Sequence, residues 1–118
     1  TNGVTVSSDE RLKKNIQTIP PSLNTIMKLR PVTYDLRLDK IGVEAERVDV
    51  EDYEDKSGLI AQEVEKVLPN IVKAPNEERD FYSVNYTELI PYLISGMQEQ
   101  QAQIDELKTE LEALKAQK

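Results

Sequence analysis

Apolar residues recur at a regular spacing in the last part of the chain, residues 87–118. The intervals between them alternate between three and four residues, as in a heptad repeat. Such a narrow apolar stripe is typical of a helix in a coiled coil, and a single amphipathic helix packed on its own domain is the alternative. Glu110 at a g position and Lys115 at the next e position suit a parallel coil. The a and d positions are Ile90, Leu93, Met97, Gln100, Ile104, Leu107, Leu111 and Leu114.

Two residues interrupt this apolar stripe. Gln100 places a polar side chain in the seam, which weakens a coil locally and can fix its register. Because the seam mixes Ile, Met, Leu and Gln, it fits a coiled coil of either two or three helices. Pro91 requires the helix to begin shortly before it. The helix either starts near Thr87, with the proline in its first turn, or is capped by Asn85 with Glu88 three residues on and a kink at the proline.

The first half of the chain contains short elements separated by prolines. The run "PSLNTIMKL", residues 21–29, predicts a short helix that Pro20 and Pro21 open and that closes before Pro31. The run "VTYDLRL", residues 32–38, alternates apolar and polar positions and predicts a strand. Its apolar face comprises Val32, Tyr34, Leu36 and Leu38.

The segments before the long helix continue this alternation of helix and strand. The run "LIAQEVEKVLP", residues 59–69, predicts a helix that stops at Pro69. The tetrapeptide "PNEE", residues 75–78, predicts a turn between two strands. The sequence therefore predicts an α+β protein, with a small globular part of short strands and helices followed by a long C-terminal helix. The apolar face of the helix over 59–69 comprises Ile60, Val64, Val67 and Leu68.

Segment 44–55 concentrates the negative charge. It holds seven acidic residues and one arginine, a net charge of −6, so the remaining 106 of the 118 residues carry only −1 of the total of −7. Apolar and polar residues alternate there, and the alternation shifts by one residue partway along the segment. This predicts a projecting hairpin or loop over residues 41–56. A calcium loop is the alternative, but no glycine lies at its middle and the acid spacing misses the EF-hand register.

Composition limits the size and the chemistry of the chain. With 38% hydrophobic and 31% charged residues, 118 residues allow one domain with a small core, so we expect burial between chains. The absence of cysteine excludes disulfides and thiolate metal sites, and the absence of histidine excludes a Ser-His-Asp triad. We expect no metal or other cofactor. The net charge argues against nucleic-acid binding, and the lack of a long apolar run or a secretory leader argues against a membrane span.

The stretch "TVSSDERLKKNI", residues 5–16, has two interpretations. Ser7 and Glu10 fit the S-x-x-E pattern of a capping box at the start of a helix, with the lysines as surface residues. The other interpretation is a reactive centre. Without histidine, a serine nucleophile needs a lysine or a carboxylate as its base, and this stretch contains both.

Four blocks of sequence, taken in order, resemble the intramolecular chaperone domain that is also classed as peptidase family S74. The run "SDERLKKNI" at 8–16 matches the S-D-x-R-x-K opening of that family. It is followed by "LRPVTYDL" at 29–36, by "GLIAQEVEKVLPNIV" at 58–72 and by "YSVNYTELIPYLI" at 82–94. The acidic segment matches none of these blocks.

The resemblance implies a self-releasing assembly factor. Members form homotrimers, assist folding of the β-rich shaft of their own polypeptide in phage tail spikes, tail fibres or neck appendages, and then cut themselves off. Residues 1–7 would end that shaft, 8–84 would form the chaperone domain, and 85–118 would form a parallel trimeric coiled coil. Assembly would take place in the host cytoplasm and the parent protein would join the virion tail, without the released module.

The resemblance also implies the residues of the site. Ser8 corresponds to the nucleophile and Lys13, rather than Lys14, to its base, with the cut between Ser7 and Ser8. Asp9 and Arg11 fill motif positions to which we assign no role. Lysine accepts a proton only after losing its own, and burial lowers the pKa of a lysine. We therefore expect a single cleavage per chain, once folding or association has removed water from the dyad.

Two other functions fit the same features. One is a trimerisation cap or receptor-binding tip of a fibre without any chemistry. The other is the self-cleaving domain of a membrane-tethered transcription factor, in which cleavage frees a neighbouring domain.

Overall fold

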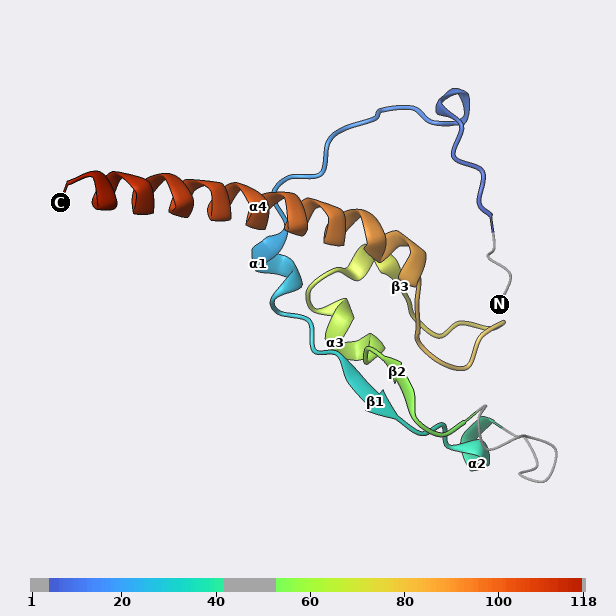
Figure 1. Ribbon diagram of the computed structural model, residues 1–118. Coiled ribbons are helices and arrows are strands. Elements are labelled where there is room, and N and C mark those ends of the chain that lie inside the picture. The colour runs from blue at the N-terminus through green and yellow to red at the C-terminus, as the bar shows by residue number, and fades with distance from the viewer. Residues whose placement is uncertain (1–4, 42–52, 118) are drawn as a thin grey trace.

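The computed structural model describes residues 5–41 and 53–117. Short helices and strands gather at the N-terminal end of one long helix, α4 (Tyr86–Ala116), as Figure 1 shows. The predicted α+β class and the predicted long helix are therefore confirmed. The other elements, in chain order, are η1 (Glu10–Leu12), α1 (Leu23–Ile26), β1 (Val32–Tyr34), α2 (Leu38–Ile41), β2 (Lys56–Gly58), α3 (Ala61–Glu65), η4 (Pro69–Ile71), β3 (Val72–Lys73) and β4 (Ser83–Val84).

Two small antiparallel sheets frame the globular part. In the first, β1 pairs with β2 and Val32 lies opposite Gly58. The strand predicted over residues 32–38 is wrong beyond Tyr34, because the partner β2 spans only three residues and Leu38 already begins α2. Strand β2 was not predicted, since its sequence, Lys-Ser-Gly, has no alternation of apolar and polar residues.

The second sheet confirms the predicted turn. Strands β3 and β4 pair antiparallel, and the segment between them reverses at residues 76–79, one residue beyond the predicted 75–78. Asn76 and Arg79 exchange backbone hydrogen bonds of 2.8 and 3.2 Å. The side-chain oxygen of Asn76 also accepts a hydrogen bond of 2.9 Å from the backbone N–H of Glu78, which is the usual way in which asparagine stabilises a turn.

A small hydrophobic core joins α3, η4 and the start of α4. Val64 and Ile71 are each 1% exposed, and Leu68 and Leu89 complete the buried set. The predicted helical face over residues 59–69 thus supplies two of its four members to the core, whereas Ile60 lies at the edge and is 36% exposed. Helix α3 is shorter than predicted, because Pro69 begins a separate 3₁₀ turn.

The start of α4 is held by the chain around it. Asn85 occupies the N-cap position, but its side chain makes no capping hydrogen bond. Its backbone N–H instead donates to the Ile71 carbonyl at 2.8 Å, which ties the helix to the core. The helix begins shortly before Pro91, as predicted, but at Tyr86, so the proline lies beyond the first turn.

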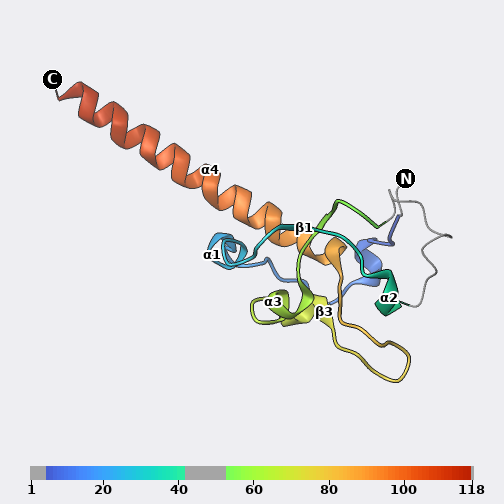
Figure 2. The same ribbon diagram turned by 90° about the horizontal axis from the view of Figure 1, so that it is seen from below.

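The chain is elongated. Its radius of gyration is 20.2 Å, whereas a compact chain of this length has a radius of about 13 Å. Figure 2 shows the cause, because α4 continues alone well beyond α1 and every other element. The hairpin or loop predicted over residues 41–56 lies largely outside the described residues.

Candidate functional site

The residues of the S-D-x-R-x-K motif form a single tight turn. Asp9 takes an extended conformation and caps η1, where its Oδ1 accepts a hydrogen bond of 2.8 Å from the backbone N–H of Arg11. The capping box predicted from Ser7 to Glu10 is therefore wrong, since the cap is Asp9 and the element is one 3₁₀ turn instead of a helix. Backbone hydrogen bonds from Leu12 to Asp9 and from Lys13 to Glu10 close the turn.

Arg11 forms a two-pronged ion pair with Asp9 across this turn. Its Nε lies 3.1 Å from Oδ1 of Asp9 and its terminal nitrogen lies 2.8 Å from Oδ2. The Arg11 side chain, and then its backbone N–H, hold the pKa of Asp9 below the ordinary aspartate value. The same pair raises the pKa of Arg11. Because both side chains are exposed to water, this ion pair fixes the shape of the turn more than it stabilises the fold.

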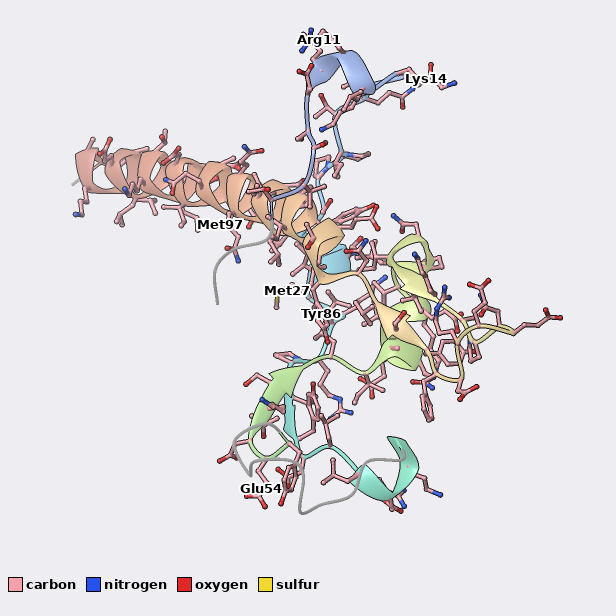
Figure 3. The ribbon with its side chains drawn as sticks, turned by 90° about the vertical axis from the view of Figure 1, so that its right-hand side faces the viewer. Arg11, Lys14, Met27, Glu54, Tyr86 and Met97 are labelled. Carbon is pink, nitrogen blue, oxygen red and sulfur yellow. The ribbon has the colours of Figure 1, made fainter. Side chains whose placement is uncertain are left out.

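The turn brings the two residues of the proposed dyad together. The Nζ of Lys13 donates a hydrogen bond of 2.7 Å to the Oγ of Ser8. Lys14 lies beyond the turn, and Figure 3 shows its side chain pointing outward. Asn15 follows with φ of 55°, in the left-handed region that asparagine tolerates better than most residues, and turns the chain away.

The turn lies on an arm that projects from the body. Figures 1 and 3 show this arm running away from α4 before it returns to α1. Its apolar residues Val6, Leu12 and Ile16 are 67%, 72% and 66% exposed. Ser8 and Lys13 are exposed as well. A serine hydroxyl in contact with a lysine amine is the pairing that a nucleophile and its base require, but here both side chains are exposed to water.

The arm is fixed at the point where it meets α4, through contacts that the sequence analysis missed. The hydroxyl of Ser95 donates 3.1 Å to the Pro20 carbonyl, and the hydroxyl of Ser22 donates 2.8 Å to the same oxygen. The Oε1 of Glu99 accepts a hydrogen bond of 3.0 Å from the backbone N–H of Leu23, the first residue of α1. The two hydrogen bonds that involve α4 join residues about 75 apart in sequence, so no local pattern reveals them.

The residues assigned to the coiled-coil seam all lie on the exposed surface of α4. Among the residues that the structure describes, no element covers α4 beyond α1 (Figure 2). The exposed fractions are 70% for Met97, 45% for Ile104, 63% for Leu107, 51% for Leu111 and 60% for Leu114, and Gln100 is exposed as well.

Within the described residues, no three acidic side chains come close enough together to hold a metal ion. Nor does any helix among them have the length and apolar character needed to cross a membrane.

Comparison with curated proteins finds similar sequences in phage tail fibres. The long tail fiber protein Gp37 of Salmonella phage S16 is 34% identical over 113 residues, which cover 93% of this chain and 14% of the phage protein. The proteins of the same name from Enterobacteria phages K3 and T2 are each 29% identical over 110 residues, which cover 92% of this chain and 8% of theirs. The chain therefore spans less than a sixth of the length of the relatives it matches.

A family model described as the chaperone of endosialidase, peptidase S74, matches residues 8–73. The match begins at Ser8, includes the whole motif turn and extends to the end of β3. It covers more than half of the 118 residues. Taken with the tail fibre relatives, it shows that this chain belongs to the chaperone of endosialidase family, peptidase S74.

Proposed function

We propose that this chain is the self-cleaving chaperone domain of a phage tail fibre. It trimerises through α4, assists the folding of the fibre shaft that precedes it, and then releases itself by cutting between Ser7 and Ser8. The observation that best supports the cleavage is the 2.7 Å hydrogen bond between Lys13 Nζ and Ser8 Oγ. The family and the tail fibre relatives support the chaperone role and the place of the parent protein in a virion tail.

The proposed reaction is an attack within the chain. The Ser8 Oγ gives its proton to the Lys13 amine and bonds to the carbonyl carbon of Ser7. The C–N bond between the two residues breaks, and the proton passes to the freed nitrogen of Ser8. Water then hydrolyses the resulting ester, which leaves a carboxylate on Ser7 and restores the Ser8 hydroxyl. Because both partners belong to one short turn, positioning supplies much of the rate and no turnover is needed.

The exposure of the dyad sets a condition on this reaction. In the single chain both residues of the dyad are exposed, and the Lys13 amine lies within hydrogen-bond distance of the Ser8 hydroxyl. A lysine becomes a base when it loses its water shell, because burial disfavours the charged form. We infer that neighbouring chains, or the shaft itself, cover the arm and so start the reaction. Cleavage then marks completed assembly.

Variants of four residues test the dyad and its alignment. Ser8→Ala and Lys13→Ala should each abolish cleavage, whereas the matched controls Ser7→Ala and Lys14→Ala should still cut. The measurement is the intact mass and N-terminal sequence of freshly made protein, with a new N-terminus at Ser8 as the sign of cleavage. A dead Lys14→Ala beside an active Lys13→Ala would contradict the assignment, and loss of cleavage in Ser7→Ala alone would identify Ser7 as the nucleophile.

The exposure of Ser8 and Lys13 favours a second candidate function, a trimerisation cap or receptor-binding tip without chemistry. That candidate uses the same α4 seam and leaves the motif turn as a structural feature. It predicts that the unsubstituted chain, joined to its natural upstream shaft, keeps its full mass indefinitely after trimer formation.

A further inference from the structure

An apolar groove runs between α1 and α4 at the level where the coiled-coil seam begins. Its volume is about 270 Å³, and it is lined by Leu23, Ile26, Met27, Gly96, Met97 and Gln100, among others. Met27 and Met97 are each 70% exposed. Figure 3 shows both methionines on the same side of α4. The groove is therefore an unpartnered apolar surface in this single chain.

Helix α1 packs against α4 at Gly96. A Cβ built on Gly96 would come within 2.8 Å of the Cδ1 of Ile26, so the glycine makes room for the short helix. The hydrogen bond from the Leu23 backbone to Glu99 holds α1 in this place. In the heptad register Gly96 occupies a g position, and α1 supplies there the apolar side chains that the glycine lacks.

The register of the seam indicates what would lie opposite α1. In a parallel coiled coil, the g position of one helix lies beside the e positions of its neighbour, and Gly96 falls between the e residues Ile94 and Gln101. The groove also contains the seam residues Leu93, Met97 and Gln100, so it opens directly beside the a/d stripe. A neighbouring helix that packs on this stripe would thus present its e flank to α1.

The e positions of α4 change character at this level. Ile94 is an e residue, apolar and 50% exposed, and it lies beside the level of α1. The later e positions are Gln101, Lys108 and Lys115, which suit the polar flank of an ordinary coil. The unfilled apolar groove on the g side of one copy therefore complements the isolated, exposed apolar e residue of the next copy.

We propose that the α1–α4 groove is a second contact between copies of this chain, in which it receives Ile94 of a neighbouring copy. The proposal rests on the parallel trimer of the proposed function, but it adds a contact outside the coil itself. The occupant is a second copy because an in-register coil brings Ile94 to the height of the groove. Seating it would fix α1, the element from which the arm with Ser8 and Lys13 departs.

Cross-linking tests this contact directly, because the chain contains no cysteine of its own. In a Ser8→Ala background, Met27→Cys with Ile94→Cys should give covalent dimers and trimers on a non-reducing denaturing gel after mild oxidation. The matched control combines Met27→Cys with Lys108→Cys, an e position two heptads further along. It should remain mostly uncrosslinked, since a disulfide needs Cα atoms within about 7 Å.

A second set of variants measures the same contact without a disulfide. Met27→Asp and Ile94→Asp should each raise the protein concentration at half-assembly at least tenfold by light scattering, whereas the exposed control Lys28→Asp should change it less than twofold. The groove contact alone is overturned if the parent is a trimer, its cysteine pair does not cross-link, and its Met27→Asp variant assembles like the control. A parent that is monomeric at micromolar concentration overturns the proposed trimer as well.

Discussion

The six residues from Ser8 to Lys13 close on themselves because each of the intervening motif residues has a geometric task. Asp9 caps the 3₁₀ turn, and Arg11 holds the Asp9 carboxylate from the other side. The turn then directs Lys13 back to Ser8. In the proposed reaction Asp9 and Arg11 would be positioning residues, which act through the distance between the hydroxyl and the amine.

Substitution of Asp9 separates its two tasks. Asparagine keeps an oxygen that caps the turn but loses the ion pair, so Asp9→Asn should cut less than twofold more slowly, because an exposed ion pair contributes little. Alanine loses the cap as well, and Asp9→Ala should cut about fivefold more slowly, which corresponds to a typical N-cap. Cleavage time courses by mass spectrometry give the order. Equal rates for the two variants would show that the cap does not position the dyad.

The Asp9 carboxyl should titrate at unusually low pH. Since its pKa in the folded chain lies below the ordinary value of about 3.9, the stabilisation by Arg11 is fully present above that value and is lost as pH falls through the lowered pKa. Carbon NMR titration of the uncleaved Ser8→Ala chain should show this midpoint, and Arg11→Gln should move it upward. An Asp9 midpoint that is the same with Arg11 and with Arg11→Gln would mean that the Asp9–Arg11 ion pair does not form in solution.

At the scale of elements, local patterns predicted what depends on neighbours in sequence and missed what depends on distant partners. The Asn76 turn and the long α4 follow from local chemistry, and both were predicted. The strand over 32–38 failed because β1 takes its length from β2, more than 20 residues away. In the motif turn, the contact between Ser8 and Lys13 joins residues five apart in sequence, whereas the anchor by Glu99 depends on how α1 packs against α4.

The small core makes single buried residues important for stability. Ile71 is 1% exposed and packs among the few buried side chains, so Ile71→Ala should lower the free energy of unfolding by about 3 kcal/mol. The same substitution at Ile16, which is 66% exposed on the arm, should change it by less than about 0.5 kcal/mol. Urea unfolding followed by circular dichroism would measure both. Similar losses for the two variants would mean that the arm is as buried as the core in solution.

At the scale of the whole molecule, many large apolar side chains of the described residues are exposed to water. The seam of α4, the groove beside α1 and the arm all present apolar residues to water. All three lie outside the core of α3, η4 and the start of α4. Association through these surfaces would bury apolar area that stays exposed in the single chain. It would cover the arm at the same time.

This arrangement predicts that the coil controls cleavage from a distance. Leu107 and Leu111 are 63% and 51% exposed in the single chain, so replacing both by aspartate should leave the fold of each chain intact. In a trimer the same substitutions would bury unpaired carboxylates, at a cost of several kcal/mol per chain, and the trimer should dissociate. The arm then stays in water, the lysine keeps its charge, and cleavage should stop although Ser8 and Lys13 are unchanged.

The measurement compares the cut fraction by mass with the trimer fraction by light scattering, across a dilution series of the double variant and of the parent chain. The two fractions should fall together. The control is Glu106→Lys with Glu112→Lys, which changes charge on α4 outside the a and d positions and should leave both fractions unchanged. A monomeric double variant that cuts at the rate of the parent would show that each chain carries a complete site, because its lysine could then act without burial by a neighbour.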